Sequence, residues 1–234
     1  MNKPQAWLRA AYIIERMREM NRLRFNDILR EATIYLDERA KEIQFNGREC
    51  KFSHLGKEVT LLACEPDIIE IFFDESYKKL NVEGKTIIDV GCAAADTAIY
   101  FAMHGAKKVI GYDCSPEAVM FGKRNIALNG MEETITISER MVAGLGELPE
   151  ADALKMDIEG AEHEIFAKAS DAEIRKFKEI VLEFHDGHQD LKERLEKAGY
   201  KVSVGKFTFN KNGILHAKAT EAAIEHIASM GTGT

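Results

Sequence analysis

The chain has 234 residues, of which 45% are hydrophobic and 30% charged, and its formal net charge is −7. This composition is typical of a globular protein with a full core, and only four prolines and no polar repeat argue against long disordered linkers. No apolar run is long enough to span a bilayer and no signal peptide is visible, so we expect a cytoplasmic protein without membrane contact. The four cysteines show no Cys-x-x-Cys spacing, which argues against a zinc site or a disulfide framework.

The N-terminal segment differs in charge from the rest of the chain. Residues 1–30 carry seven basic and three acidic side chains, a net +4, which leaves −11 for the remainder. Apolar residues recur there at three- and four-residue steps, which indicates a helix, and a second helix is expected over 26–43. We expect a helical extension over residues 1–45 that docks on the acidic body of its own chain. Binding to nucleic acid is the less favoured alternative.

Residues 46–80 are expected to form a hairpin and a lead-in helix. Asn46-Gly47 is a hairpin turn signal, and Glu58 to Cys64 has the pattern of a strand. Asp67 to Leu80 has a helical pattern.

Residues 81–220 alternate between strands and helices, and 221–234 form a C-terminal tail. Strands are predicted at 86–91, 108–113, 134–138, 153–157, 179–185, 201–208 and 213–219, with helices near 96–105, 116–129, 160–169 and 189–199. Such alternation predicts an α/β fold, a Rossmann-like, doubly wound and mostly parallel seven-stranded sheet. No helix separates the last two strands, and the turn at 210–213 predicts that the sheet ends in an antiparallel hairpin.

The first predicted strand of this domain runs into a turn of small residues. The apolar run ends at Asp89-Val90-Gly91, small residues continue to Ala95, and Asp96 or Thr97 is the expected helix cap. The next strand ends at Asp113, and this arrangement is typical of a site for a ribose-bearing cofactor. Because Gly-x-Gly-x-x-Gly is absent, a cofactor without a phosphate, S-adenosylmethionine, is favoured over NAD.

Each residue on the cofactor side has an expected role. Gly91 lets the chain approach the methionine part, and Asp89 orders the turn or binds the cofactor's amino group. Asp113 accepts hydrogen bonds from the ribose hydroxyls, because Ser115 is the better cap for the following helix. The other cofactor-binding candidates lie in the same turns and after the third strand, where adenine is expected; they are Cys92, Ala93, Cys114, Glu139, Arg140 and Met141.

Acidic residues and a histidine follow the fourth and fifth strands and are the catalytic candidates. Asp157 is expected to contact the acceptor or the methyl donor, Glu159 is the next candidate, and His185 is a plausible general base. Glu162 lies one helical turn beyond Glu159 and could share its helical face. The alternatives are acids that stabilise a helix N-terminus and a structural histidine. A divalent cation is the less favoured option, and we predict no metal; its ligands would come from Asp157, Glu159, His185, Asp186 and His188.

Several blocks of the sequence together carry a family resemblance. Ile87 to Ala102, Gly105 to Asp113, Asn125 to Gly130 and the run Lys-Met-Asp-Ile-Glu-Gly-Ala-Glu at 155–162 resemble the FkbM family of class I methyltransferases. The resemblance covers about residues 67–205 and implies an enzyme that uses S-adenosylmethionine and releases S-adenosylhomocysteine. Ala93 and Ala95 depart from the usual Gly-Ala-Asn-x-Gly turn, which puts the cofactor affinity in doubt.

The function expected from this resemblance is O-methylation of a small-molecule or sugar-like hydroxyl. An RNA (tRNA) methyltransferase using the basic N-terminus and a catalytically silent cofactor-binding protein are the alternatives. The absence of an Asn/Asp-Pro-Pro-Tyr motif weakly disfavours N-methylation of bases or amides. The sequence identifies neither the acceptor nor the oligomeric state.

Overall fold

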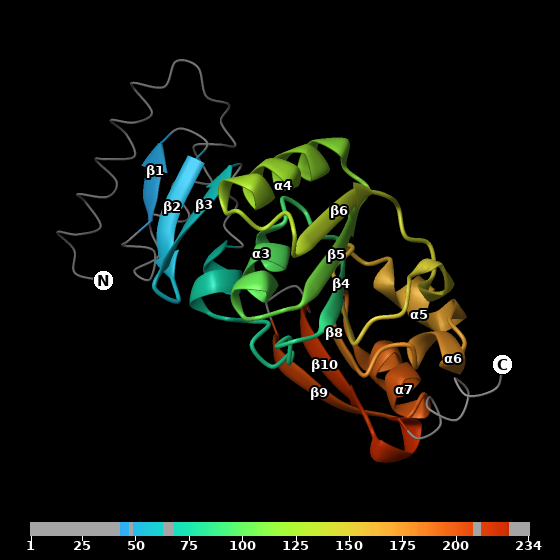
Figure 1. Ribbon diagram of the computed structural model, residues 1–234. Helices are drawn as coiled ribbons and strands as arrows, with labels where there is room; N and C mark the ends of the chain where they lie inside the picture. The colour runs from blue at the N-terminus through green and yellow to red at the C-terminus, as the bar shows by residue number, and fades with distance from the viewer. Residues whose placement is uncertain (1–42, 47–48, 63–67, 208–211, 225–234) are drawn as a thin grey trace. The chain divides into compact units, whose positions relative to one another are not determined.

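The computed structural model describes residues 43–46, 49–62, 68–207 and 212–224, and the chain divides into two compact units, 1–76 and 77–234 (Figure 1). The predicted helices over residues 1–42 and residues 210–211 of the predicted turn lie outside these ranges, and Ile43, the predicted end of the second helix, is described and is not helical. No helix in the described ranges is long and apolar enough to cross a membrane.

The first unit contains a small antiparallel sheet in the order β1-β2-β3. Its strands are β1 (Gln44–Asn46), β2 (Glu49–His54) and β3 (Lys57–Leu62), so the predicted hairpin around Asn46 is confirmed. Leu55 and Gly56 join β2 to β3 with φ of 49° and 72°, the two positive values that a tight type I′ turn requires.

The helix predicted for Asp67 to Leu80 is much shorter than expected. One π-type helical turn, η2 (Ile69–Phe73), is closed by a hydrogen bond from the amide of Asp74 to the carbonyl of Ile69. Glu75 then adopts a φ of 51°, which is incompatible with a continued right-handed helix. The prediction was therefore wrong beyond Phe73.

The second unit is built on a seven-stranded sheet in the order β6-β5-β4-β7-β8-β10-β9. The strands are β4 (Thr86–Val90), β5 (Lys108–Asp113), β6 (Ile135–Glu139), β7 (Ala153–Met156), β8 (Glu179–Phe184), β9 (Tyr200–Phe207) and β10 (Gly213–Ala219). The first five are parallel, whereas β10 pairs antiparallel with both β8 and β9. This confirms the predicted doubly wound sheet and its antiparallel end.

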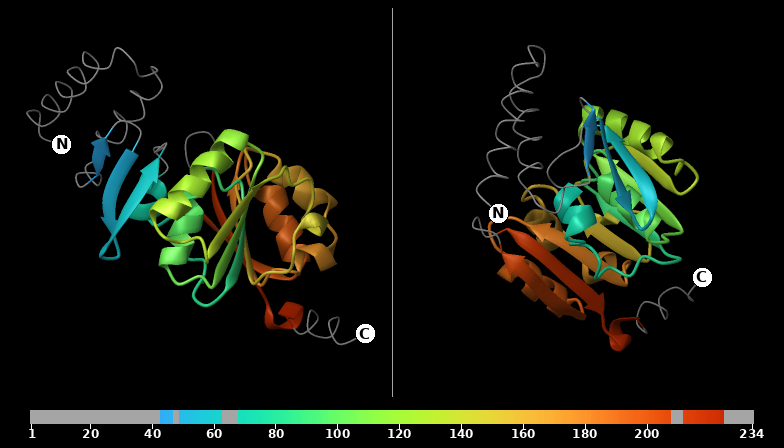
Figure 2. Two further views of the ribbon diagram at one scale, coloured as in Figure 1. Left: turned by 45° about the horizontal axis from the view of Figure 1, so that its top comes forward. Right: turned by 90° about the vertical axis from the view of Figure 1, so that its left-hand side faces the viewer.

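Helices cover both faces of this sheet. Helices α3 (Asp96–Met103) and α4 (Pro116–Leu128) lie on one face, and α5 (Glu162–Lys168), α6 (Asp171–Ile174) and α7 (Gln189–Lys197) on the other (Figure 2). A short 3₁₀ turn, η3 (Leu145–Glu147), precedes β7. The order of strands, reversing between β4 and β7, creates the switch point beside which ligands bind in such sheets.

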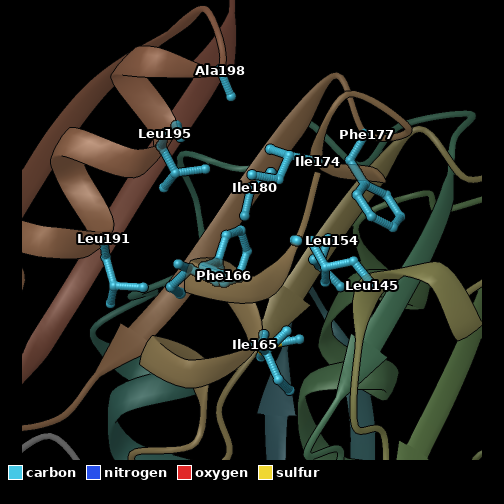
Figure 3. Packing of buried hydrophobic residues seen from close by; sticks show 14 of the residues in the cluster. Leu145, Leu154, Ile165, Phe166, Ile174, Phe177, Ile180, Leu191, Leu195 and Ala198 are labelled. Atoms are coloured by element: carbon cyan, nitrogen blue, oxygen red, sulfur yellow. The ribbon is translucent and has the colours of Figure 1, made fainter. Parts of the chain in front are cut away.

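The core under α5 and α7 explains why these short helices hold their positions. Leu191 and Leu195 of α7 point toward Phe166 of α5 and Ile180 of β8, and all four are at most 1% exposed (Figure 3). Fully burying a side chain of this size contributes about 1.5–3 kcal/mol. The loops that follow β7 and β8 therefore stand on a closely packed base.

A buried carboxylate fixes the opposite, amino-terminal end of β8. Glu179 is 4% exposed; its Oε2 accepts a hydrogen bond from the amide of Asn81 at 3.0 Å, and Lys218 Nζ lies 3.4 Å from Oε1. Burial alone would raise the pKa of Glu179, but the nearby ring of His216, whose Nε2 lies 3.9 Å from Oε2, the hydrogen bond from Asn81 and the charges of Lys85 and Lys218 lower it to about 2.

This carboxylate predicts an acid-dependent loss of stability. Since its pKa is lowered from 4.5 on folding, its contribution is complete above pH 4.5 and disappears as pH falls toward 2. We expect the wild-type protein to lose about 2–3 kcal/mol more unfolding free energy than Glu179→Gln between pH 5 and pH 2. Urea unfolding across this range measures the difference, and parallel curves for the two proteins would contradict it.

Candidate active site

The turn after β4 is shaped by the absence of a side chain at Gly91. Its φ is +73°, and a Cβ atom there would lie 1.7 Å from the main-chain oxygen of Asp157. Only glycine therefore fits, and the close contact brings the end of β7 against the predicted cofactor turn. Ala93 and Ala95 also have positive φ, 42° and 66°, a conformation that costs an alanine about 1–2 kcal/mol.

Asp113 at the end of β5 is tied to this turn. Its Oδ2 accepts a hydrogen bond from the amide of Ala93 at 2.9 Å, and its Oδ1 accepts one from the amide of Ser115 at 2.8 Å. Ser115 Oγ caps α4 by accepting from the amide of Ala118, as the sequence predicts. Each carboxylate oxygen keeps a second lone pair, so Asp113 retains the capacity to accept from ribose hydroxyls.

The turn is held from its other side by a residue that sequence reasoning did not single out. Asn125 of α4 is wholly buried, and its Nδ2 donates to the carbonyl of Ala94 at 2.9 Å. The Asn-Ile-Ala-Leu-Asn-Gly motif contains this residue, but its distance from the turn in sequence concealed the contact.

A buried ion pair lies directly beneath the turn. Lys155 of β7 is 2% exposed; its Nζ is 3.1 Å from Asp89 Oδ1 and donates to the carbonyl of Gly91 at 2.8 Å. Thr97 Oγ1 donates to the other oxygen of Asp89 at 2.6 Å. Asp89 is 0% exposed, so in this arrangement it orders the turn and has no surface to offer a ligand.

Burial and the neighbouring charges have opposite effects on the pKa of each member of this pair. Burial raises the pKa of Asp89, whereas Lys155 and the Thr97 hydrogen bond lower it. Burial would lower the pKa of Lys155, but the charges of Asp89 and Asp157 and the contact with Asp89 raise it well above its ordinary value. The ring of Tyr77 adds a cation–π contact at 5.9 Å, so the ammonium group stays charged.

The other predicted cofactor-binding residues occupy different environments. The side chain of Cys92 is wholly buried, and burial raises the pKa of its thiol, so it presents no reactive surface. Cys114 is exposed. Glu139 ends β6, Arg140 donates its amide to the carbonyl of Asp113 at 2.8 Å, and Met141 is 75% exposed. The segment from Glu139 to Met141 therefore starts next to Asp113, at the end of β5.

The acceptor-side candidates gather after β7 and β8, which are parallel neighbours. One ligand atom each from Asp157, Glu183 and His185 lies within 4.8 Å of the other two, close enough for the three to hold a cation together. Glu159 is 88% exposed, and its Oε2 is 3.4 Å from His185 Nε2. Glu183 was absent from the sequence candidates, because alternation along a strand does not reveal which residue faces a neighbouring loop.

Asp186 and His188 were the remaining residues of the less favoured metal set. Neither belongs to the group of Asp157, Glu183 and His185; Asp186 is exposed and has a φ of 62°. His188 is half-buried with its ring 5.1 Å from that of Phe184.

Two local expectations about helix starts were wrong. Helix α3 begins at Asp96 with Ala95 at the cap position and no side-chain cap, because Thr97 is committed to Asp89. Helix α5 begins at Glu162 and not at residue 160, since Glu159 has a φ of 57°. Glu159 and Glu162 therefore do not share a helical face.

The buried pair predicts an asymmetric mutational response. We expect Lys155→Met to lower the unfolding free energy by about 3–5 kcal/mol, because it leaves a buried carboxylate without its cation. Lys178→Met is the matched control: Lys178 is 57% exposed and pairs with Asp152 at 3.2 Å, so its loss should cost about 1 kcal/mol or less. Urea unfolding of both variants measures the contrast, and similar losses would contradict a buried, charged Lys155.

Comparison with known proteins supports the assignment of this region. The family model of ribosomal protein L11 methyltransferase matches residues 74–159, which include the turn, Asp113 and Asp157. This match covers the cofactor side and ends before His185. The resemblance to FkbM methyltransferases is not among these matches.

Two curated proteins are similar to parts of the chain. Over 126 residues the chain is 29% identical to uncharacterized protein 158B of Sulfolobus islandicus rod-shaped virus 1, covering 53% of this chain and 76% of that protein. It is 45% identical over 58 residues to ribosomal protein L11 methyltransferase of Vibrio cholerae, covering 25% of this chain. The chain spans only 20% of that enzyme's length.

Solved structures share the fold. Magnesium protoporphyrin IX methyltransferase from Synechocystis PCC 6803, solved with bound S-adenosylhomocysteine, has a TM-score of 0.50 at 16% identity, covering 65% of this chain and 81% of that one. Other structures of this fold are a ribosomal protein L11 methylase and a putative tRNA methyltransferase. The chain thus has the fold of class I methyltransferases, and the comparisons support an S-adenosylmethionine-dependent methyltransferase.

Proposed function

We propose that this protein transfers the methyl group of S-adenosylmethionine to a protic acceptor, a hydroxyl of a small or sugar-like molecule. The observation that carries the proposal is the contact between Gly91 and the main chain of Asp157. It joins the proposed cofactor turn to the end of β7, beside which Asp157, Glu183 of β8 and His185 converge. A methyl donor on the turn and an acceptor at these side chains would therefore be neighbours, as direct transfer requires.

The cofactor would be held by the turn after β4 and by Asp113. The amide of Ala93 already orients the carboxylate of Asp113, so binding the ribose needs little rearrangement. Cys92, Ala93, Cys114, Glu139, Arg140 and Met141 stay predictions as cofactor-binding residues, and Glu139 to Met141 would border the adenine. S-adenosylmethionine supplies an electrophilic methyl group and leaves as S-adenosylhomocysteine.

On the acceptor side, Asp157 and Glu159 would bind the hydroxyl, and His185 would accept its proton. Three carboxylates surround this point, Asp157, Glu159 and Glu183, which disfavours a polyanion at the transfer position. This charge supports a small neutral or cationic acceptor over RNA, although one solved structure of this fold is named a putative tRNA methyltransferase and one sequence relative a ribosomal protein L11 methyltransferase. Membership of the FkbM family, a cytoplasmic location and the absence of a metal stay predictions.

The proposal predicts a cofactor affinity that depends on Asp113. Calorimetry with S-adenosylmethionine and S-adenosylhomocysteine should give binding to the wild type that falls about 100-fold in Asp113→Ala, because two hydrogen bonds to a charged acceptor are lost. Glu133→Ala removes an exposed acid outside the site and should leave the affinity unchanged. Failure of the wild type to bind either ligand, or equal binding by Asp113→Ala, would overturn the cofactor assignment.

A second measurement addresses the acceptor. A panel of hydroxyl compounds and tRNA, assayed for methyl transfer from labelled cofactor, should give turnover with a small hydroxyl compound, and His185→Gln should reduce kcat about 100-fold or more without changing cofactor affinity. Transfer to tRNA alone would identify the RNA alternative. Cofactor binding without turnover across the panel would favour the catalytically silent alternative.

A further inference from the structure

Glu162 is a carboxylate with no exposed surface at the first residue of α5. Its Oε2 accepts a hydrogen bond from the amide of Gly160 at 2.8 Å. Its Oε1 accepts one from the amide of His185 at 2.9 Å and lies 3.0 Å from Nδ1 of the same histidine. A buried carboxylate is tolerated only when hydrogen bonds replace its hydration. The bond from Gly160 lies within the loop after β7, whereas the two contacts with His185 connect this loop to the loop after β8.

These contacts determine which nitrogen of His185 carries its proton. An ionised carboxylate can only accept, so the ring nitrogen that faces Glu162 must be the donor. In the neutral ring this is the Nδ1–H form, which leaves a lone pair on Nε2. Nε2 lies 3.4 Å from the carboxylate of Glu159, which is longer than a normal hydrogen bond and involves an 88% exposed side chain, so the buried Glu162 at 3.0 Å decides the tautomer. Nε2 also belongs to the group formed with Asp157 and Glu183.

The main chain of His185 is braced as well as its ring. Its amide is held by Glu162, and its carbonyl lies 2.7 Å from Nε2 of His163, whose Nδ1 is 2.7 Å from Asp190. With the ring only 13% exposed, little freedom remains for it to rotate away from this position. Such a fixed imidazole is what a general base needs.

We propose that Glu162 is the positioning residue of the methyl transfer: it holds His185 in the Nδ1–H tautomer with Nε2 directed at the acceptor. The catalytic part of this inference rests on the proposed function, whereas the tautomer does not. In the reaction, the acceptor oxygen forms a bond to the methyl carbon, the carbon–sulfur bond breaks, and S-adenosylhomocysteine leaves. The acceptor's proton moves to Nε2 of His185 and then to water.

This assignment narrows the substrate class. Because His185 enters the reaction with a free lone pair, it serves an acceptor that must lose a proton, such as a hydroxyl or an amine. An acceptor that is methylated without losing a proton would gain nothing from Glu162.

The tautomer can be measured on the ¹⁵N-labelled full chain without cofactor or acceptor. Long-range ¹H–¹⁵N spectra above the pH at which the ring is charged should show wild-type His185 protonated at Nδ1. In Glu162→Gln the ring should shift toward the Nε2–H form. Glu159→Gln is the matched control: it removes the other carboxylate at the ring and should leave the tautomer at Nδ1–H.

Two outcomes would overturn the proposal. One is a wild-type His185 protonated at Nε2; this measurement uses no variant, so it remains possible even if Glu162→Gln does not fold. The other is a folded Glu162→Gln with an unchanged tautomer. Neither outcome depends on cofactor binding. A negative result in the Asp113→Ala binding experiment would therefore contradict the proposed function without contradicting the tautomer of His185. With an acceptor in hand, Glu162→Gln should lower kcat about 100-fold or more with the affinity for S-adenosylmethionine unchanged.

Discussion

The ion pair between Lys155 and Asp89 is the interaction on which the site depends. It joins β7 to β4 at the point where the strand order reverses, and it also reaches the carbonyl of Gly91. A charge pair without water is stabilising only with additional hydrogen bonds, and here Thr97 and Gly91 supply them. The shape of the turn is thereby set by the core beneath it and not by a ligand.

The same principle recurs on the acceptor side with different chemistry. Glu162 has no cation of its own and is satisfied by two main-chain amides and a ring nitrogen. One buried acid thus orders the turn after β4, where we propose that the cofactor binds, and another orders the loops that would receive the acceptor. Both do so by fixing main chain, which packing of apolar side chains alone cannot do at a loop.

The sheet was predictable because its strands are short apolar runs separated by amphipathic helices, and their burial enforces that pattern. The place of Asp113 at the end of β5 and the cap by Ser115 were predictable for a local reason, since an apolar run that closes on an acid and a serine before proline are local signals; the ribose role of Asp113 stays a prediction. Lys155 was not singled out, because a lysine gives no sign in the sequence that its partner lies 66 residues away. Glu162 was misplaced because positive φ at Glu159 and Gly160 delays the helix, and pattern reasoning assigns no such value to a glutamate.

Lys155 of β7 and Asp157, the first residue after that strand, stand two residues apart, yet one supports the turn after β4 and the other lies in the group with Glu183 and His185. This spacing limits how the protein can diverge. Exchanges after Asp157 and after Phe184 alter loops and leave the buried pair intact, so new acceptors are accessible by small steps. An insertion within β7 would instead displace Lys155 from Asp89 and from the carbonyl of Gly91, and so disturb the turn after β4. Changes of acceptor specificity in such a chain are therefore confined to its loops.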